Sequence, residues 1–303
     1  FAIEPITPGG DRFTDRGWDG KFYGHYGLGQ SLLAVPLYYA STLVIKVFPS
    51  EANVLFRTNT IQYHDPDWND NFRRFVISRY GQIIAALTCL LLFHFGLVLG
   101  YSQRNAFLLS LIYGLGTMAL PFSKTFYSEP TTTLLLLLSF YNLYRYCVTH
   151  RNSLLGWAGV LLGYSVLTRV DTVIVIPIFL IYNYKILKNN KHQTNSWLKE
   201  ILYFCLPLAL FCLLVGLVNY IRSGSMTHTG YESEGLSFSY PFLDGLYGLL
   251  MSAGKSIFIF SPPILLFFPS IQKFWQEHKE EALFCCGLSL VYILFYSKWE
   301  SWA

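Results

Sequence analysis

Residues of types that could do chemistry gather first in a short segment, 15–26, rich in glycine and aromatic residues. Its ionisable and hydroxyl-bearing residues are Asp15, Asp19, Lys21, Tyr23, His25 and Tyr26. Aromatic rings with hydroxyls suit both sugars and the membrane interface, and glycines permit close backbone turns. We therefore expect either a sugar-binding loop or a structured surface loop at the level of the lipid headgroups.

A second candidate is Glu129, which is followed by Pro130 and a long apolar stretch. Proline fits the first turn of a helix, so Glu129 should lie at the amino end of one. The helix dipole favours a carboxylate there. Such a carboxylate could orient a hydroxyl or bind a divalent metal ion, and the alternative is that it only caps the helix.

A third candidate is Arg169, which lies two residues before Asp171, in a very short connection between two apolar stretches. An arginine at membrane depth is costly and usually has a partner. Asp171 is the nearest one, which gives a purely structural ion pair; the functional alternative is a guanidinium that binds phosphate. Lys255 is a second possible phosphate contact, unless it only extends toward the interface.

The elements that must position these residues are predicted by composition. Hydrophobic residues make up 53% of the 303 residues and charged residues 13%, against about 25% charge in soluble domains. Continuous apolar runs of the length that crosses a bilayer predict an all-α, polytopic transmembrane helix bundle. The predicted spans are 76–99, 105–121, 130–147, 153–168, 172–187, 200–220, 256–271 and 282–297, with a softer segment at 241–253.

Charge predicts the orientation of these spans. With the loop 185–199 in the cytoplasm, one set of loops carries nine basic residues: Arg104, Arg145, Arg151, Lys185, Lys188, Lys191, Lys199, Lys273 and Lys279. The other set carries five: Lys124, Arg169, Arg222, Lys255 and Lys298. The excess lies on the cytoplasmic side, as the positive-inside rule requires. The net charge of +4, without a basic stripe, gives no reason to expect a nucleic-acid partner.

This orientation also predicts the domain organisation. Residues just before Val76 must lie outside, so 31–48 cannot cross fully if 1–30 belong to the same external layer. We therefore expect 1–74 to form an external first loop with an interfacial helix over 31–48, and 75–303 to form a bundle of about eight spans. An ordinary crossing by 31–48 stays the alternative. We also expect the chain to be a fragment cut at both ends, since it starts at Phe1 and stops at Ala303 just after a predicted helix.

Several segments together resemble lipid-linked-sugar glycosyltransferases of the GT-C superfamily. DGKFYGHYGLGQSLLAVPLY is similar to their first external loop, and GLGTMALPFSKTFYSEPTTTLLLLLSFY to their second. LLGYSVLTRVDTVIVIPIFLIY is similar to their segment with an arginine at a short external turn, and GLYGLLMSAGKSIFIFSPPILL and YSKWESWA to later segments. The order and spacing of the matches resemble most closely the bacterial protein O-mannosyltransferase-like and aminoarabinose-transferase-like members.

The resemblance implies a helix bundle with its active site at the external, periplasmic face of a bacterial inner membrane. Such enzymes move a sugar from a polyprenyl-phosphate carrier to a hydroxyl of a glycan, lipid or protein acceptor. It implies a loop aspartate as general base, near Asp15 or Asp19, and Glu129 near acceptor or metal. Arg169 and Lys255 would contact the phosphate. The family's first helix and the aspartate directly after it are not in this chain, so we expect the fragment alone to be inactive.

The resemblance also implies a geometry, in which Glu129, Arg169, Lys255 and the 15–26 loop converge on one external cavity. The substrate-binding residues would be Lys21, Tyr23, His25, Tyr26, Arg169, Asp171 and Lys255. Two alternatives stay open: a transporter or flippase of a lipid-linked substrate, and a non-catalytic member that binds lipid-linked sugars. A transporter typically has inverted repeats and ionisable groups near the midplane, whereas here these groups cluster near one face.

Overall fold

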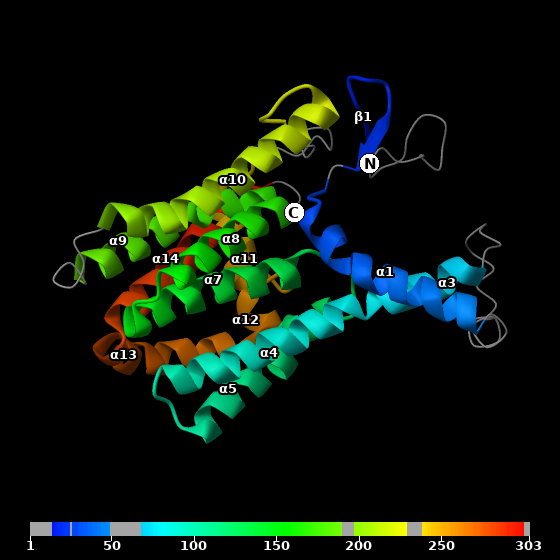
Figure 1. The fold of residues 1–303 in the computed structure, drawn as a ribbon. Helices are drawn as coiled ribbons and strands as arrows, with labels where there is room; N and C mark the ends of the chain where they lie inside the picture. The colour runs from blue at the N-terminus through cyan, green and yellow to red at the C-terminus, as the bar shows by residue number, and fades with distance from the viewer. Residues whose placement is uncertain (1–13, 25, 49–67, 190–196, 229–237, 300–303) are drawn as a thin grey trace. The chain divides into compact units, whose positions relative to one another are not determined.

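A computed structural model describes residues 14–24, 26–48, 68–189, 197–228 and 238–299 of the chain (Figure 1). Apart from one two-stranded hairpin, the described elements are helices, which confirms the predicted all-α class. The hairpin pairs β1 (Thr14–Arg16) with β2 (Phe22–Gly24) and was not predicted. Its turn contains Gly20, whose φ of 79° is one that glycine adopts readily.

The chain divides into two compact units, one of Leu28–Leu134 and the other of Phe1–Gly27 with Leu135–Ala303. Helix α7 (Glu129–Thr149) begins in the first unit and continues in the second. The predicted boundary at residue 74 follows the polarity of the sequence, whereas this division follows packing. Each unit is described below by itself.

The first unit is built from helices alone, in the part that the structure describes. They are α1 (Gly29–Val47), α3 (Trp68–Ser78), α4 (Tyr80–Val98), α5 (Gln103–Gly116), α6 (Ala119–Phe122) and the first turns of α7. Helices α4 and α5 pack closely, because a Cβ on Gly96 would lie 3.0 Å from that of Ala106. The hydroxyl of Ser110 also donates to the Cys89 carbonyl at 2.8 Å.

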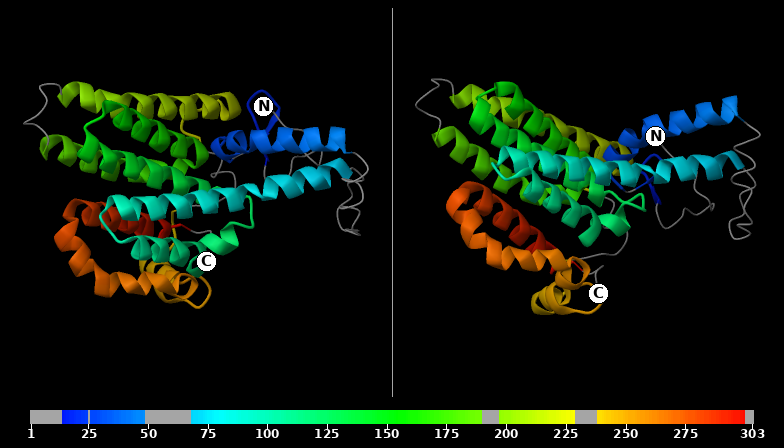
Figure 2. Two further views of the ribbon diagram at one scale, coloured as in Figure 1. Left: turned by 60° about the horizontal axis from the view of Figure 1, so that its bottom comes forward. Right: turned by 90° about the horizontal axis from the view of Figure 1, so that it is seen from below.

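The amino ends of α1, α4 and α7 lie in one layer of this first unit. Gln30 Nε2 donates to the Phe126 carbonyl at 2.9 Å, and the Tyr80 and Thr131 hydroxyls are 3.1 Å apart. From this layer α1 runs beside α3, away from α4, as both views in Figure 2 show. The length and apolar character of α1 suit a membrane crossing, so an interfacial helix and an ordinary crossing both stay predictions for 31–48.

The second unit holds the remaining helices and the hairpin. The helices are α8 (Asn152–Thr168), η1 (Val170–Val175), α9 (Ile176–Asn189), α10 (Trp197–Ser223), α11 (Phe242–Met251), α12 (Ile257–Phe260), η3 (Pro262–Leu266), α13 (Phe267–Glu277) and α14 (Lys279–Tyr296). Its core includes the stacked rings of Phe140 and Phe284, whose centroids are 4.1 Å apart. The ring of Phe179, fully buried, meets Phe284 edge-on.

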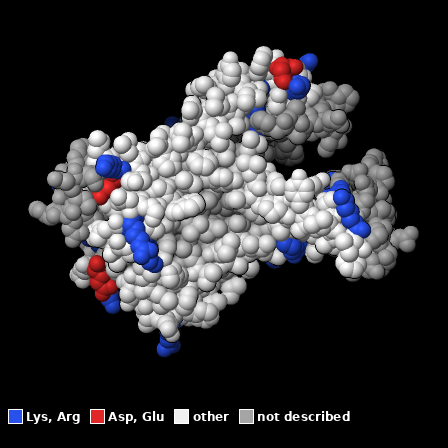
Figure 3. Space-filling model, viewed as in Figure 1, with Lys and Arg blue, Asp and Glu red and all other residues white. Residues whose placement is uncertain are grey.

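Four described helices are long and apolar enough to cross a membrane: Gly29–Val47, Phe72–Val98, Val170–Lys188 and Leu198–Ser223. Helix α10 exposes large apolar side chains such as Leu206 and Leu210, more than half of whose surface is accessible. Exposed leucines on a long helix suit contact with lipid tails. These four helices indicate an integral membrane protein, and the face drawn in Figure 3 is largely uncharged.

The structure divides one predicted span, 256–271, into three pieces: α12, η3 and α13. The break falls at Ser261, whose φ of −140° and ψ of 66° are not helical, directly before Pro262 and Pro263. A residue before proline is disfavoured in the helical region. Hydropathy alone therefore overlooked a backbone restriction that the sequence contains.

Candidate functional site

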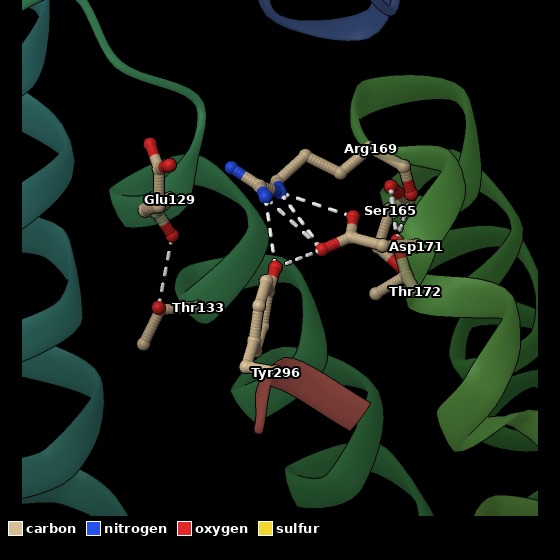
Figure 4. A network of polar contacts seen from close by, with 7 residues as sticks. All are labelled: Glu129, Thr133, Ser165, Arg169, Asp171, Thr172 and Tyr296. Carbon is tan, nitrogen blue, oxygen red and sulfur yellow. Dashed lines mark hydrogen bonds and ion pairs between the residues drawn. The ribbon is translucent and has the colours of Figure 1, made fainter. Parts of the chain in front are cut away.

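Arg169, Asp171 and Tyr296 form a network of polar contacts in the second unit (Figure 4). Nε and Nη2 of Arg169 each donate to Asp171 at 3.0 Å, to Oδ1 and Oδ2 respectively. Nη2 also donates to the Tyr296 hydroxyl at 2.9 Å, and that hydroxyl donates to Oδ2 of Asp171. The ion-paired side chains are only 17% and 16% exposed, so they are largely removed from water.

The end of α8 fixes this network in place. Arg169 follows the last residue of α8 with extended backbone, and its N–H donates to the Ser165 carbonyl at 2.8 Å. The fully buried Thr172 donates its hydroxyl to the same carbonyl at 2.9 Å. The chain then enters η1 at once, so Arg169 and Asp171 lie on one tight turn with little freedom.

The pair predicted as the structural alternative for Arg169 is therefore present. A guanidinium can take acceptors along two edges, and Asp171 uses the edge formed by Nε and Nη2. A phosphate that bound Arg169 would approach through Nη1, which points away from Asp171 in Figure 4. Asp171 is thus placed to orient the guanidinium, and the phosphate contact stays a prediction.

Tyr296 was not among the predicted site residues. It lies at the last residue of α14, 125 positions from Asp171. The only sequence signal was its place at the start of YSKWESWA, one of the segments that carry the family resemblance.

In the hairpin, Asp19 contacts two other predicted site residues, Lys21 and Tyr23. Its carboxylate accepts the Lys21 N–H at 3.1 Å and the hydroxyl of the buried Tyr23 at 2.9 Å, and the Lys21 ammonium lies 3.8 Å away. The Lys21 N–H, with smaller contributions from the Tyr23 hydroxyl and the Lys21 charge, lowers the pKa of Asp19 below its usual value. The hydrogen bond to Asp19 raises the pKa of Tyr23 in turn.

The hairpin lies at the Arg169 end of the second unit. A Cβ on Gly27, directly after this segment, would lie 2.3 Å from the Thr168 carbonyl oxygen and 2.6 Å from that of Leu167. Backbone therefore meets backbone one residue before Arg169, a contact that only glycine permits. The structure thus brings the segment with Asp19, Lys21 and Tyr23 to the end of α8 that carries Arg169.

The other predicted residues of this segment are described in part. Asp15 pairs with Tyr23 in the β1–β2 ladder, and its side chain lies outside the described residues. His25 also lies outside them. Tyr26 is half-exposed, and its carbonyl accepts a hydrogen bond from Arg222 at 3.1 Å.

Glu129 is the first residue of α7, and Pro130 is buried in the first turn, as predicted. Thr133 donates its hydroxyl to the Glu129 backbone carbonyl at 2.9 Å, as Figure 4 shows. Glu129 belongs to the first unit and Arg169 to the second, so the convergence of the two side chains stays a prediction.

Lys255 lies in the turn between α11 and α12 and is exposed. Its N–H donates to the Ser252 hydroxyl at 3.2 Å. Its role as a phosphate contact stays a prediction, like that of Glu129 as a metal ligand. Within the described residues, no group of three or more His, Cys, Asp or Glu side chains is arranged to hold a metal ion.

No family model, no curated protein and no solved structure matches this chain. The geometry at the end of α8 is therefore what supports a function.

Proposed function

We propose that this chain belongs to an integral membrane glycosyltransferase that moves a sugar from a polyprenyl-phosphate carrier to an acceptor hydroxyl. The reaction would take place at the external face of a bacterial inner membrane. The packing of Gly27 on the Thr168 carbonyl carries the proposal. It joins a loop that bears acidic residues to the helix end that bears an arginine, within one compact unit.

In the proposed reaction, an acceptor oxygen attacks the anomeric carbon of the sugar, and the bond from that carbon to the phosphate oxygen breaks. The departing phosphate keeps the electron pair of that bond. Arg169 would stabilise the phosphate charge, oriented by Asp171 and Tyr296. A carboxylate of the loop, Asp15 or Asp19, would accept the proton of the acceptor hydroxyl. Glu129 would orient the acceptor or hold a metal ion.

The electrostatics of Asp19 suit part of this role. Because its pKa is lowered by the Lys21 N–H, Asp19 is ionised at neutral pH and can accept a proton. A low pKa also makes it a weak base. Asp19 would therefore act mainly by holding the acceptor hydroxyl, with proton transfer late in the reaction.

The helices suit a lipid-linked donor. The four candidate spans would place the molecule in the bilayer that holds the polyprenyl chain. Helix α1 exposes Leu32, Tyr39 and Leu43 along its length, which suits an interfacial helix at the external surface.

The proposal is tested by transfer of radiolabelled sugar from polyprenyl-phosphate donors in membranes that contain the full-length protein. We expect transfer by the wild type and a loss of about 100-fold in Arg169→Ala, the scale of losing one transition-state contact. Arg145→Ala is the matched control, because Arg145 donates to Tyr141 within α7 and takes no part in the site. It should keep wild-type transfer.

Absence of transfer from every donor, with folded full-length wild-type protein, would contradict the proposal. Movement of the intact donor between leaflets would then indicate the transporter or flippase alternative. Binding of the donor without transfer or movement would indicate a non-catalytic member.

A further inference from the structure

We propose that Arg222 is a positioning residue, which holds the loop of residues 17–26 in place beside Arg169. The inference rests on the proposed function, because the loop matters only if its acidic residue, Asp19, acts there. Arg222 lies near the end of α10, far from the loop in sequence. No prediction from the sequence gave it a role beyond the count of external charges.

The carboxyl end of α10 contacts the loop at both of the loop's ends. Near the start of the loop, Nε1 of Trp18 donates to the Ile221 carbonyl at 3.2 Å. Near its end, Nη1 of Arg222 donates to the Tyr26 carbonyl at 3.1 Å. One helix end therefore fixes two points of the loop, and the residues between them include Asp19.

Close backbone contacts strengthen this attachment. A Cβ on Gly17 would lie 2.6 Å from the Arg222 carbonyl oxygen, so the loop backbone lies directly against α10. Gly224, whose φ is 77°, turns the chain just after α10, and its Cβ would meet Trp18 at 3.6 Å. A larger residue at position 17 would push the loop away from the helix.

The ends of α8 and α10 are held at a fixed distance from one another. A Cβ on Gly159 of α8 would lie 2.1 Å from the Phe204 carbonyl oxygen of α10, and one on Gly163 would lie 2.6 Å from Cβ of Phe211. Such close approach leaves the two helices little freedom to slide. Gly27 packs against the end of α8, and the Tyr26 carbonyl accepts a hydrogen bond from the end of α10. The loop is therefore attached to two helix ends that are fixed relative to one another.

Arginine suits this task better than an uncharged residue. A charged donor makes a stronger hydrogen bond to a carbonyl than a neutral one does. Lysine keeps the charge and a donor, so it should preserve much of the attachment, whereas methionine keeps only the length. The comparison of Arg222→Lys with Arg222→Met therefore separates the hydrogen bond from simple packing.

The attachment is measured first without any assay of activity. A nitroxide label on Arg16→Cys, in a variant without the six native cysteines, reports the motion of β1 from an exposed position. We expect clearly faster motion in Arg222→Met and near wild-type motion in Arg222→Lys. Arg145→Met is the matched control and should not change the spectrum. If Arg222→Met does not fold, Trp18→Phe, which removes the indole N–H together with part of the ring, should show the same increase.

Sugar transfer by the same variants, without the label, completes the test. We expect kcat to fall about 10-fold or more in Arg222→Met, with partial rescue in Arg222→Lys and a smaller change in KM. Unchanged label motion in both Arg222→Met and Trp18→Phe would overturn the inference. Faster label motion in Arg222→Met together with wild-type sugar transfer would overturn the positioning role of Arg222. Faster motion in a protein whose wild type transfers no sugar would contradict the proposed function and leave the attachment standing.

Discussion

At the scale of the residue, the candidate site depends on how Arg169 is held. Its guanidinium meets a carboxylate two residues along the chain and a phenol from the end of α14, all largely buried. Such an arrangement fixes the direction of the charge before any ligand arrives, which is what stabilisation of a departing phosphate requires. The same contacts also stabilise the fold, so the two roles need separate measurements.

The stabilising role is measured by removing either partner of Arg169, Asp171 or Tyr296. We expect Asp171→Asn to lower the free energy of unfolding by about 1–3 kcal/mol, because Arg169 would lose its counter-ion in a largely buried place. Tyr296→Phe should cost less, about 0.5–1.5 kcal/mol, because only a hydroxyl is lost. Denaturant unfolding in detergent, followed by tryptophan fluorescence, measures both. Equal stability of Asp171→Asn and wild type would show that the ion pair is not a stabilising contact.

The lowered pKa of Asp19 predicts that the hairpin becomes more mobile in acid. Its folded pKa lies below the usual 3.8, so its contribution to order is present above about pH 4 and is lost as the pH falls through the lowered value. The motion of a label at Arg16→Cys should therefore stay constant from about pH 5 to 8 and increase in stronger acid. Asp19→Asn should abolish most of this increase. An increase that begins near pH 6 would point to another group.

At the scale of the element, the hairpin and the ends of α8 and α10 form one assembly. Glycines at three contacts, Gly17, Gly27 and Gly159, allow backbone to meet backbone where a Cβ would not fit. The sequence shows the glycines of the loop and predicts close turns there. It does not show which helix end receives them, because those partners are about 140 to 200 residues away.

The contact between α8 and α10 gives a prediction with a matched control. Gly159→Ala should destabilise the protein by about 1–3 kcal/mol, since its Cβ would lie 2.1 Å from a backbone oxygen that cannot move independently. Gly156→Ala, one turn earlier, would meet its nearest atom at 3.8 Å and should be neutral or slightly stabilising. The melting temperatures of both variants, measured by thermal unfolding in one detergent, test this difference in stability. Equal melting temperatures would show that the two helices pack less closely than described.

At the scale of the whole molecule, composition and continuous apolar runs predict an all-helical membrane protein. The described elements are helices apart from one hairpin, and four of the helices are long and apolar enough to cross a membrane. The turn at Arg169 and the start of α7 at Glu129 were also predictable, because they depend on neighbours in the sequence. The division into units, the break before Pro262 and the partnership with Tyr296 were not predicted. They depend on packing, on backbone restriction and on contacts between distant residues.

Contacts of α9 and η1 with α14 show which loop positions lie at the same end of these helices. Lys185 near the end of α9 pairs with Glu280 at the start of α14, at 2.6 Å, while Asp171 and Tyr296 meet at the other end. Positions 185 and 279 therefore share one end of these helices, and 169 and 298 share the other. The predicted sets of cytoplasmic and external loops have the same grouping.

Single cysteines in a variant without native cysteines test this orientation in the membrane. Lys188→Cys should react with an impermeant thiol reagent only after the cytoplasmic side is opened. Lys124→Cys and Arg16→Cys should react in intact cells. Reaction of Lys124→Cys and Lys188→Cys from the same side would contradict the orientation. Reaction of Arg16→Cys only from the cytoplasm would show that α1 crosses.

The most direct test of the account is whether Glu129 and Arg169 act on one sugar phosphate. Transfer from a polyprenyl-phosphate donor is measured for the wild type, Glu129→Gln, Arg169→Ala and the double variant, with Glu277→Gln as control. We expect each single loss to lower kcat/KM about 100-fold and the double variant to fall much less than their product, because groups of one site are not additive. Near wild-type transfer by Arg169→Ala, or a fully additive double variant, would contradict the sequence-based prediction that the two residues act in one site.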